Sequence, residues 1–76
     1  MRVLLADDHQ LMLEGLRSVL EAHGIEVVGM ATDGLECLAE AREQHPDVIL
    51  MEVAMPRCDG LRATRLVKSE MPEIQV

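Results

Sequence analysis

The sequence predicts an α/β domain with a parallel sheet and helices on both faces. Three short apolar runs lack the alternation of a half-exposed strand, as is typical of buried parallel strands; they cover residues 2–6, 25–30 and 47–53. Stretches with helical spacing of apolar residues separate these runs, and the connections are short. Because strand-helix-strand crossovers are right-handed, this alternation places helices on both sides of one parallel sheet.

In the first half of the chain, a strand over residues 2–6 is followed by a helix over residues 10–22. Gly24 follows as the stop signal of that helix. Gly15 costs roughly 1 kcal/mol relative to Ala inside a helix, which suggests a close approach there. A second strand is predicted over residues 25–30. The helical spacing is carried by Met12, Leu13, Leu16, Val19 and Leu20.

In the second half, Asp33 and Glu36 form a capping-box pattern that opens a second helix, and Pro46 ends it. Residues 47–53 form the third strand, and Asp59 can cap a third helix over residues 60–70. Residues 73–76 look like the start of a fourth strand. The expected apolar faces are Leu35, Leu38 and Ala39 in the second helix and Ala63, Leu66 and Val67 in the third.

Length and composition narrow the class of protein. The 76 residues suffice for one domain, residues 1–76, and the net charge of −7 argues against a surface that grips a phosphate backbone. The apolar runs are too short to span a membrane. Cys37 and Cys58 have no ligand-like spacing and follow no signal peptide, which favours reduced thiols in a cytoplasmic protein.

Three acids stand where predicted strands end: Asp7 and Asp8 directly after the first, and Glu52 within the last residues of the third. If these strands are neighbours in a parallel sheet, the acids converge at one edge, where open α/β folds place their chemistry. Carboxylates so close repel one another unless a cation or protons intervene. The pattern therefore predicts a divalent-metal site. His9 is expected to be a solvated residue at a helix start rather than a ligand.

The chain resembles a response-regulator receiver domain. The resemblance rests on Val3-Leu4-Leu5-Ala6-Asp7-Asp8-His9 and on an apolar strand that ends in an acid and is followed by Met-Pro-x-x-Asp-Gly, residues 55–60. Asp8-His9-Gln10-Leu11, Glu14-Gly15-Leu16 and Ala31-Thr32-Asp33-Gly34 resemble the NarL/FixJ (LuxR-type) branch. The motifs agree in order and spacing over the whole chain.

The resemblance implies roles for particular residues. Asp7 and Asp8 match the acid pair that holds Mg²⁺, and the backbone carbonyl of Ala54 would be a further ligand. Glu52 stands at the phosphoacceptor position, where the family has an aspartate that receives a phosphoryl group from a sensor histidine kinase. In this interpretation the chain is a signalling module and not an enzyme.

Glu52 departs from the family pattern by one methylene group. This group moves the carboxylate outward by roughly 1 Å, a displacement that can cost about 10²-fold in rate. Two interpretations stay open: Glu52 imitates a phosphorylated aspartate, or it blocks phosphorylation and leaves the domain off. A single carboxylate is an incomplete copy of a phosphoryl group, which carries nearly two charges.

The family has five strands and five helices, and this chain reaches the first residues of the fourth strand. The expected fold is therefore an incomplete flavodoxin-like (CheY-like) sheet of strand order 2-1-3-4, truncated at the fourth strand. The parent would be a transcription factor whose downstream domain binds DNA, so no nucleic acid contact is expected from residues 1–76. A sheet face left bare by the missing fifth helix favours a dimer.

Two alternatives of other classes stay open. A metal-dependent phosphohydrolase would need a nucleophile and a second acid two residues later, whereas Asp7 is followed by Asp8 and His9. The chain could also serve only as an assembly or folding unit. Gly60 is interpreted as a requirement of loop geometry.

Overall fold

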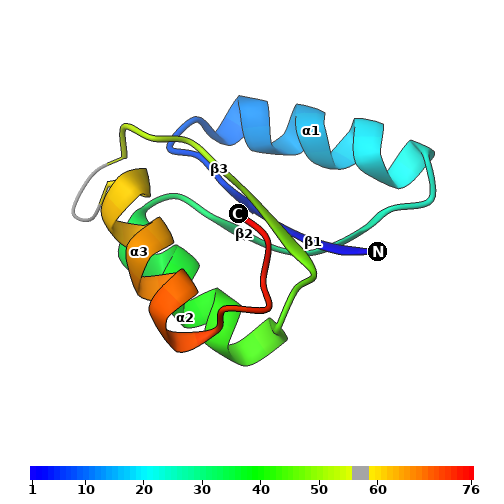
Figure 1. Cartoon of the computed structure of the whole chain (residues 1–76). Helices are drawn as coiled ribbons and strands as arrows, with labels where there is room; N and C mark the ends of the chain where they lie inside the picture. The colour runs from blue at the N-terminus through cyan, green and yellow to red at the C-terminus, as the bar shows by residue number, and fades with distance from the viewer. Residues whose placement is uncertain (56–58) are drawn as a thin grey trace.

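The computed structural model describes residues 1–55 and 59–76 and contains three strands and three helices within them (Figure 1). Strands and helices alternate along the chain, as the apolar pattern predicts. Their bounds are β1 Arg2–Ala6, α1 Gln10–Ala22, β2 Glu26–Ala31, α2 Gly34–Gln44, β3 Val48–Met51 and α3 Gly60–Glu70. None of the described helices has the length and apolar character needed to cross a membrane.

The sheet is parallel, with the order β2-β1-β3, so the first strand is central. On one side Arg2 pairs with Glu26 and Ala6 with Ala31, with one irregularity between Val3 and Leu4. On the other side β1 pairs with β3. The expected fourth strand is reduced, within the described residues, to a single parallel bridge between Val48 and Gln75. That bridge lies beside β3, where the order 2-1-3-4 places a fourth strand.

Helices cover both faces of the sheet (Figure 1). Side chains alternate along β1, so Leu4 and Ala6 belong to one core and Val3 and Leu5 to the other. The first core lies under α2 and α3, and it is the larger one. The second lies under α1, whose Leu13 is fully buried. This arrangement is the three-layer α/β architecture that the sequence predicts.

Local signals place the helix ends as expected. Asp33 Oδ1 accepts a hydrogen bond from the Glu36 N–H at 2.8 Å, and Asp59 Oδ1 accepts one from the Arg62 N–H at 2.8 Å. Each aspartate therefore caps its helix. Gly24 adopts a φ of 78° after α1. His45 ends α2 with a φ of 47°, just before Pro46.

Helical spacing did not identify which apolar side chains are buried. In α1, Met12 and Val19 are exposed although they share the helical spacing of the buried Leu13. In α2, the expectation for Leu35 and Ala39 is wrong, because both are exposed. The α2 residues that face the core are Gly34, Cys37, Leu38 and Ala41. A small rotation of a helix about its axis turns a different row of side chains toward the sheet. Tertiary packing, and not the spacing of apolar residues in the sequence, sets this rotation.

The third helix agrees with expectation. Ala63 and Val67 are fully buried and Leu66 packs against the core as a partly buried side chain. Cys37 is fully buried in the core under α2 and α3. Pro56, Arg57 and Cys58 lie outside the described residues, and so does the expectation of a reduced thiol at Cys58.

Candidate functional site

The backbone ladder carries the three predicted acids to the same edge of the sheet. Beyond β1, the N–H of Asp7 donates to the carbonyl of Ala31 at 3.0 Å. Beyond β3, the N–H of Glu52 donates to the carbonyl of Ala6 at 2.8 Å. Parallel pairing therefore continues one residue past each strand, and the acids leave the sheet at its carboxyl end.

Asp7, Asp8 and His9 form a compact cluster there. The His9 Nδ1 atom lies 2.9 Å from Asp7 Oδ1 and 3.0 Å from Asp8 Oδ1. Asp7 Oδ1 also accepts the backbone N–H of His9 at 2.9 Å, which fixes the Asp7 carboxylate in an Asx turn. The Asp7 residue is buried, whereas the His9 side chain is 73% exposed. The cluster is open to solvent on the His9 side.

The charges in this cluster shift two pKa values in opposite directions. Burial acts to raise the pKa of Asp7, but the hydrogen bonds from the backbone and ring of His9 outweigh it and leave the pKa lowered. The hydrogen bond to Asp7 raises the pKa of His9, and the negative charges of Asp8, Asp7 and Glu52 add to this rise. The site therefore favours a carboxylate at Asp7 and a positive charge beside it.

The Glu52 carboxylate makes a local contact instead of joining this cluster. Its Oε1 accepts the N–H of the next residue, Val53, at 3.0 Å. Among residues 1–55 and 59–76, the acidic and histidine side chains whose donor atoms all lie within 4.8 Å of one another are Asp7, Asp8 and His9. Sequence reasoning put Glu52 in this trio and left His9 out. The only sequence signal for His9 was its position directly after the acid pair.

The segment after β3 is held against the start of α3. The Gly60 N–H donates to the Val53 carbonyl at 2.6 Å. A side chain at Gly60 would meet the Glu52 carbonyl oxygen and the Val53 Cα, at 2.2 and 2.8 Å from its Cβ. The requirement for glycine is therefore steric, which confirms the interpretation of loop geometry. Ala54 is exposed in this segment.

The donors present fit a divalent cation. Two carboxylates lie side by side, and Asp7 is pre-positioned by backbone and ring hydrogen bonds. Carboxylate oxygens are the side-chain ligands that Mg²⁺ prefers, with the remaining positions taken by carbonyls and water. Asp7 and Asp8 would hold such an ion, which supplies positive charge next to any anionic group that approaches the sheet edge.

Comparisons with known proteins identify the family. Residues 3–76 match the model of the response regulator receiver domain. The chain is 47% identical to the response regulator GacA of Pseudomonas viridiflava over 76 residues, 99% of this chain. It spans 36% of the length of that relative.

Comparison with solved structures identifies the same family. The response regulator domain of Thermotoga maritima CheB superposes with a TM-score of 0.91 at 38% identity, covering 95% of this chain and 55% of that one. A LuxR-family response regulator from Aurantimonas sp. SI85-9A1 superposes with a TM-score of 0.90 at 34% identity, covering 96% and 53%. These matches favour a receiver over a phosphohydrolase. With its 2-1-3 parallel sheet and an acid pair at the carboxyl edge, the chain belongs to the response regulator receiver domain family.

Proposed function

We propose that this chain is a receiver module of a two-component response regulator in which Glu52 keeps the phosphoacceptor position silent. The observation that carries this proposal is the hydrogen bond between Glu52 Oε1 and the Val53 N–H. It holds the carboxylate at its own backbone, outside the group that Asp7, Asp8 and His9 form among the described residues. An acid held in this way contributes charge near the acid pair but does not attack a phosphoryl donor held there.

The alternative, in which Glu52 imitates a phosphorylated aspartate, has less support. A mimic needs its charge beyond the acid pair, where a phosphoryl group would extend, and it needs several acceptor oxygens. One Glu52 oxygen is already engaged by Val53. Blocking requires only that the nucleophile be displaced by roughly 1 Å, and the additional methylene group provides that displacement.

Phosphorylation by a small donor tests this proposal directly. The chain is incubated with acetyl phosphate and Mg²⁺, and the intact mass is measured over time. We expect no phosphoryl adduct on the chain itself and a measurable adduct on Glu52→Asp, because the shorter side chain cannot reach the same Val53 contact and returns the carboxylate toward the acid pair. Glu43→Asp, the same substitution at an exposed acid of α2, is the matched control.

Two results would contradict the proposal. An adduct on the unmodified chain would show that Glu52 does accept the group. An adduct on neither the chain nor Glu52→Asp, with both folded by circular dichroism, would show that another feature of this chain prevents the reaction.

The cation belongs to the same proposal. We assign Asp7, Asp8 and the backbone carbonyl of Ala54 to a Mg²⁺ site, with Glu52 contributing charge nearby. An NMR titration with Mg²⁺ should move the amide signals of Asp8 and Ala54, and Asp8→Asn should abolish the shifts. If those signals stay fixed in the unmodified chain, the cation part of the proposal fails.

The proposed partners follow from the receiver assignment. A sensor histidine kinase would be the phosphoryl source of an intact relative, and DNA binding would belong to a downstream domain of a cytoplasmic transcription factor. The acidic net charge of −7 is consistent with a segment that makes no nucleic acid contact of its own. We assign this chain no catalytic turnover.

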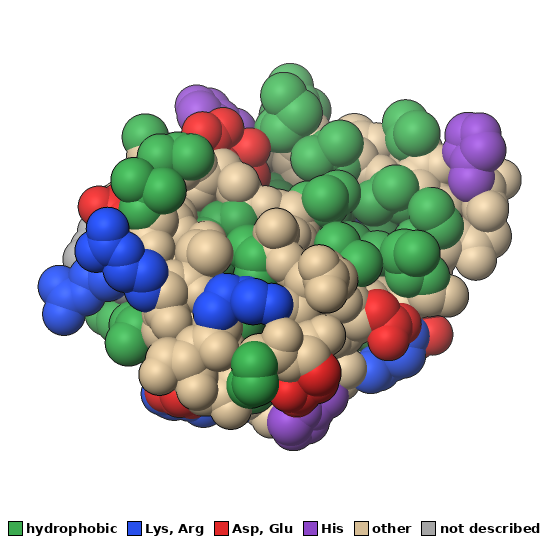
Figure 2. Space-filling view, in the orientation of Figure 1, with side chains coloured by type: hydrophobic (Ala, Val, Ile, Leu, Met, Phe, Trp, Pro, Cys, Tyr) green, Lys and Arg blue, Asp and Glu red, His purple; other side chains and the backbone are tan. Residues whose placement is uncertain are grey.

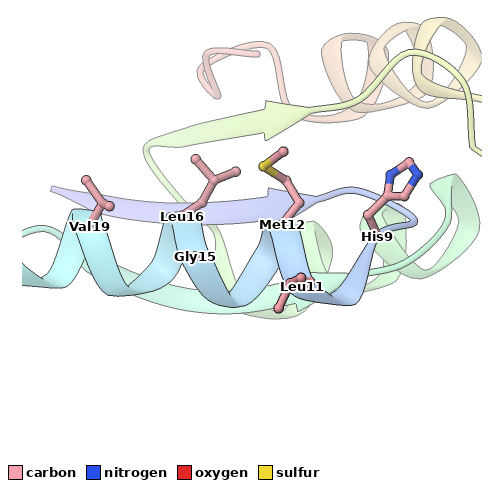
Figure 3. Close-up of a pocket in the computed structure, with 6 residues that line it drawn as sticks. All are labelled: His9, Leu11, Met12, Gly15, Leu16 and Val19. Carbon is pink, nitrogen blue, oxygen red and sulfur yellow. The ribbon is translucent and has the colours of Figure 1, made fainter.

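Self-association is proposed from an apolar surface on α1. Figure 2 shows hydrophobic side chains gathered over α1 and the adjacent sheet. Leu11 is 83% exposed, and Met12 and Val19 are more than half exposed. Figure 3 shows Met12, Leu16 and Val19 projecting from the same side of α1, with the helix backbone bare at Gly15. These residues and His9 line a groove of about 600 Å³.

The sheet extends this apolar surface. Val48 packs with the α1-side core, so Leu50, two residues later, points to the same side and is 43% exposed. A stable dimer buries roughly 1,200–2,000 Å² in total. Two copies related by a two-fold axis could bury the α1 groove and the β3 side chains against each other. The proposed occupant of this surface is a second copy of this chain.

Sedimentation equilibrium over a range of concentrations tests the dimer, with interference detection because the chain has no Trp or Tyr. We expect a concentration-dependent dimer that Val19→Glu shifts to monomer. Leu35→Glu, at a half-exposed leucine of α2, should leave the dimer intact. A monomer at every concentration, or equal dissociation in both variants, would contradict this interface.

A further inference from the structure

The basic side chains of this acidic chain differ in whether the fold uses them. Most of those in the described residues have partners within the molecule: these are Arg2, Arg17, Arg42 and Lys68. Arg62 and Arg65 of α3 are exposed, and their guanidinium groups make no hydrogen bond or ion pair with the rest of the described chain. Two cationic groups are therefore available to a partner on one helix.

The two arginines lie on the outer side of α3. Residues three apart on a helix are neighbours, with roughly 5–6 Å between their Cβ atoms. The opposite side of the helix is buried through Ala63 and Val67. The acid at the start of this helix, Asp59, is engaged by the backbone N–H of Arg62 at 2.8 Å. Figure 2 shows basic side chains gathered over α3, with hydrophobic side chains beside them.

Apolar side chains adjoin the two arginines. Leu61 is 57% exposed and lies one helical turn before Arg65, so the two side chains are neighbours. Val53 is 54% exposed, and the hydrogen bond from the Gly60 N–H to its carbonyl at 2.6 Å holds it beside the first turn of α3. We call Val53, Leu61, Arg62 and Arg65 the α3 surface. Arginine together with exposed apolar area is typical of protein-binding surfaces.

We propose that the α3 surface binds an acidic amphipathic helix of a partner protein. The carboxylates of that helix pair with Arg62 and Arg65, and an apolar side chain between them packs on Leu61 and Val53. A guanidinium fork matches a carboxylate in geometry and in charge. Carboxylates one turn apart on a helix have the same separation as the two arginines. This role is independent of Glu52 and of the proposed dimer.

Charge complementarity selects this occupant over two others. The net charge of −7 repels an acidic partner from the chain as a whole, so attraction at the α3 surface fixes where and how the partner docks. A second copy related by a two-fold axis through α3 would bring arginines against arginines. Nucleic acid binding depends on many phosphate contacts, and two arginines on an acidic chain do not supply them.

A synthetic helical peptide is the probe for this proposal. It carries two glutamates four residues apart with a leucine between them on the same face, and a matched peptide carries glutamines instead. Fluorescence anisotropy of the labelled peptides is measured at low ionic strength. We expect the glutamate peptide to bind the unmodified chain at least about fivefold more tightly than the glutamine peptide. NaCl should weaken the binding of the glutamate peptide.

Variants of the chain place the contact. Arg65→Gln should weaken binding of the glutamate peptide by about fivefold. Arg17→Gln is the matched control, because it removes the same charge from an exposed arginine of α1, and it should change the affinity by less than about twofold. Leu61→Ser should weaken binding and leave its salt dependence unchanged. In NMR spectra the peptide should shift the amide signals of Leu61, Arg62 and Arg65.

Four results would overturn this inference. The first is no binding of the glutamate peptide to the unmodified chain. The second is equal weakening by Arg65→Gln and Arg17→Gln, which would indicate general attraction between charges. The third is a set of amide shifts centred on Met12 and Val19, which would place the peptide in the α1 groove. The fourth is equally tight binding of a single-stranded oligonucleotide through Arg65, which would assign the surface to another class of partner.

Discussion

Two glycines in helices show how differently single residues are constrained in this fold. A Cβ at Gly60 would lie 2.2 Å from the Glu52 carbonyl oxygen, whereas a Cβ at Gly15 would meet nothing within 4 Å. Gly60 is therefore required by the close approach of the segment after β3. Gly15 has no such requirement within one copy of the chain, and it lies in the centre of the α1 groove.

This contrast predicts opposite effects of the same substitution. Gly60→Ala should destabilise the chain by about 1–3 kcal/mol, because backbone atoms must move to admit the methyl group. Gly15→Ala should stabilise the isolated fold by up to about 1 kcal/mol, because alanine is the better helix former. Urea denaturation followed by circular dichroism measures both. A neutral Gly60→Ala would mean that the β3–α3 contact is not formed in solution.

At the scale of elements, α2 and α3 are joined by an ion pair. Arg42 Nε lies 2.8 Å from Glu70 Oε2, and Arg42 Nη2 lies 2.6 Å from Glu70 Oε1. The hydrogen bonds from Arg42 lower the pKa of Glu70 below its ordinary value of 4.5. A lowered carboxyl pKa means that the folded state favours the ionised form, so the stabilisation is present above that value and disappears as the pH falls.

The pH dependence of one variant checks this pair. Glu70→Gln should lower the melting temperature at neutral pH by a small amount, since both side chains are exposed to solvent. The difference between variant and chain should shrink as the pH falls through 4.5 and below. Glu43→Gln, at an exposed acid of α2, is the control. A difference that grows at low pH would contradict the assigned direction.

A second link at this scale ties the end of the chain to α3. Lys68 Nζ donates to the Pro72 carbonyl at 2.9 Å and to the Ile74 carbonyl at 2.7 Å. The next residue, Gln75, exchanges backbone hydrogen bonds with Asp47 and Ile49. Lys68→Met should therefore speed hydrogen exchange at the amides of Ile49 and Gln75, measured by NMR, whereas Arg65→Met should not. Unchanged exchange in Lys68→Met would show that the bridge to β3 holds without the lysine.

Prediction from sequence succeeded for structural features that residues close together in the chain determine. Asp33 and Asp59 cap their helices because a short polar side chain reaches an N–H three residues ahead, and both residues and spacing are visible in the sequence. Prediction from sequence failed for features that depend on contacts between distant parts of the chain. The exposure of Leu35 depends on how α2 is rotated on the sheet, and the contacts of Lys68 depend on a chain reversal after α3.

The candidate functional site shows the same difference between features with local causes and features with remote causes. The carboxyl edge and the acids at it follow from strand order, which the resemblance to receiver domains implies. The orientation of the Glu52 carboxylate depends on which backbone N–H it reaches, and the position of the His9 ring depends on the turn that Asp7 makes. Side-chain rotamers of this kind are not encoded in spacing, so the cluster of Asp7, Asp8 and His9 could not be derived from the sequence.

At the scale of the whole molecule, the net charge of −7 predicts a response to salt. Screening weakens repulsion among the acids, so NaCl should raise the melting temperature. Mg²⁺ should raise it further than NaCl of matched ionic strength, because binding to the folded state adds stability. Asp8→Asn should remove only this additional increment. Equal effects of Mg²⁺ and matched NaCl on the unmodified chain would count against a bound ion.

The central position of β1 has a consequence for the order in which the molecule is made. Of the three described strands, β1 leaves the ribosome first, and it needs one partner that ends at Ala31 and another that ends at Met51. Until the second partner is synthesised, one edge of β1 presents unpaired backbone groups together with apolar side chains. Among the three described strands, the central one is therefore the one that waits longest during synthesis for its second partner.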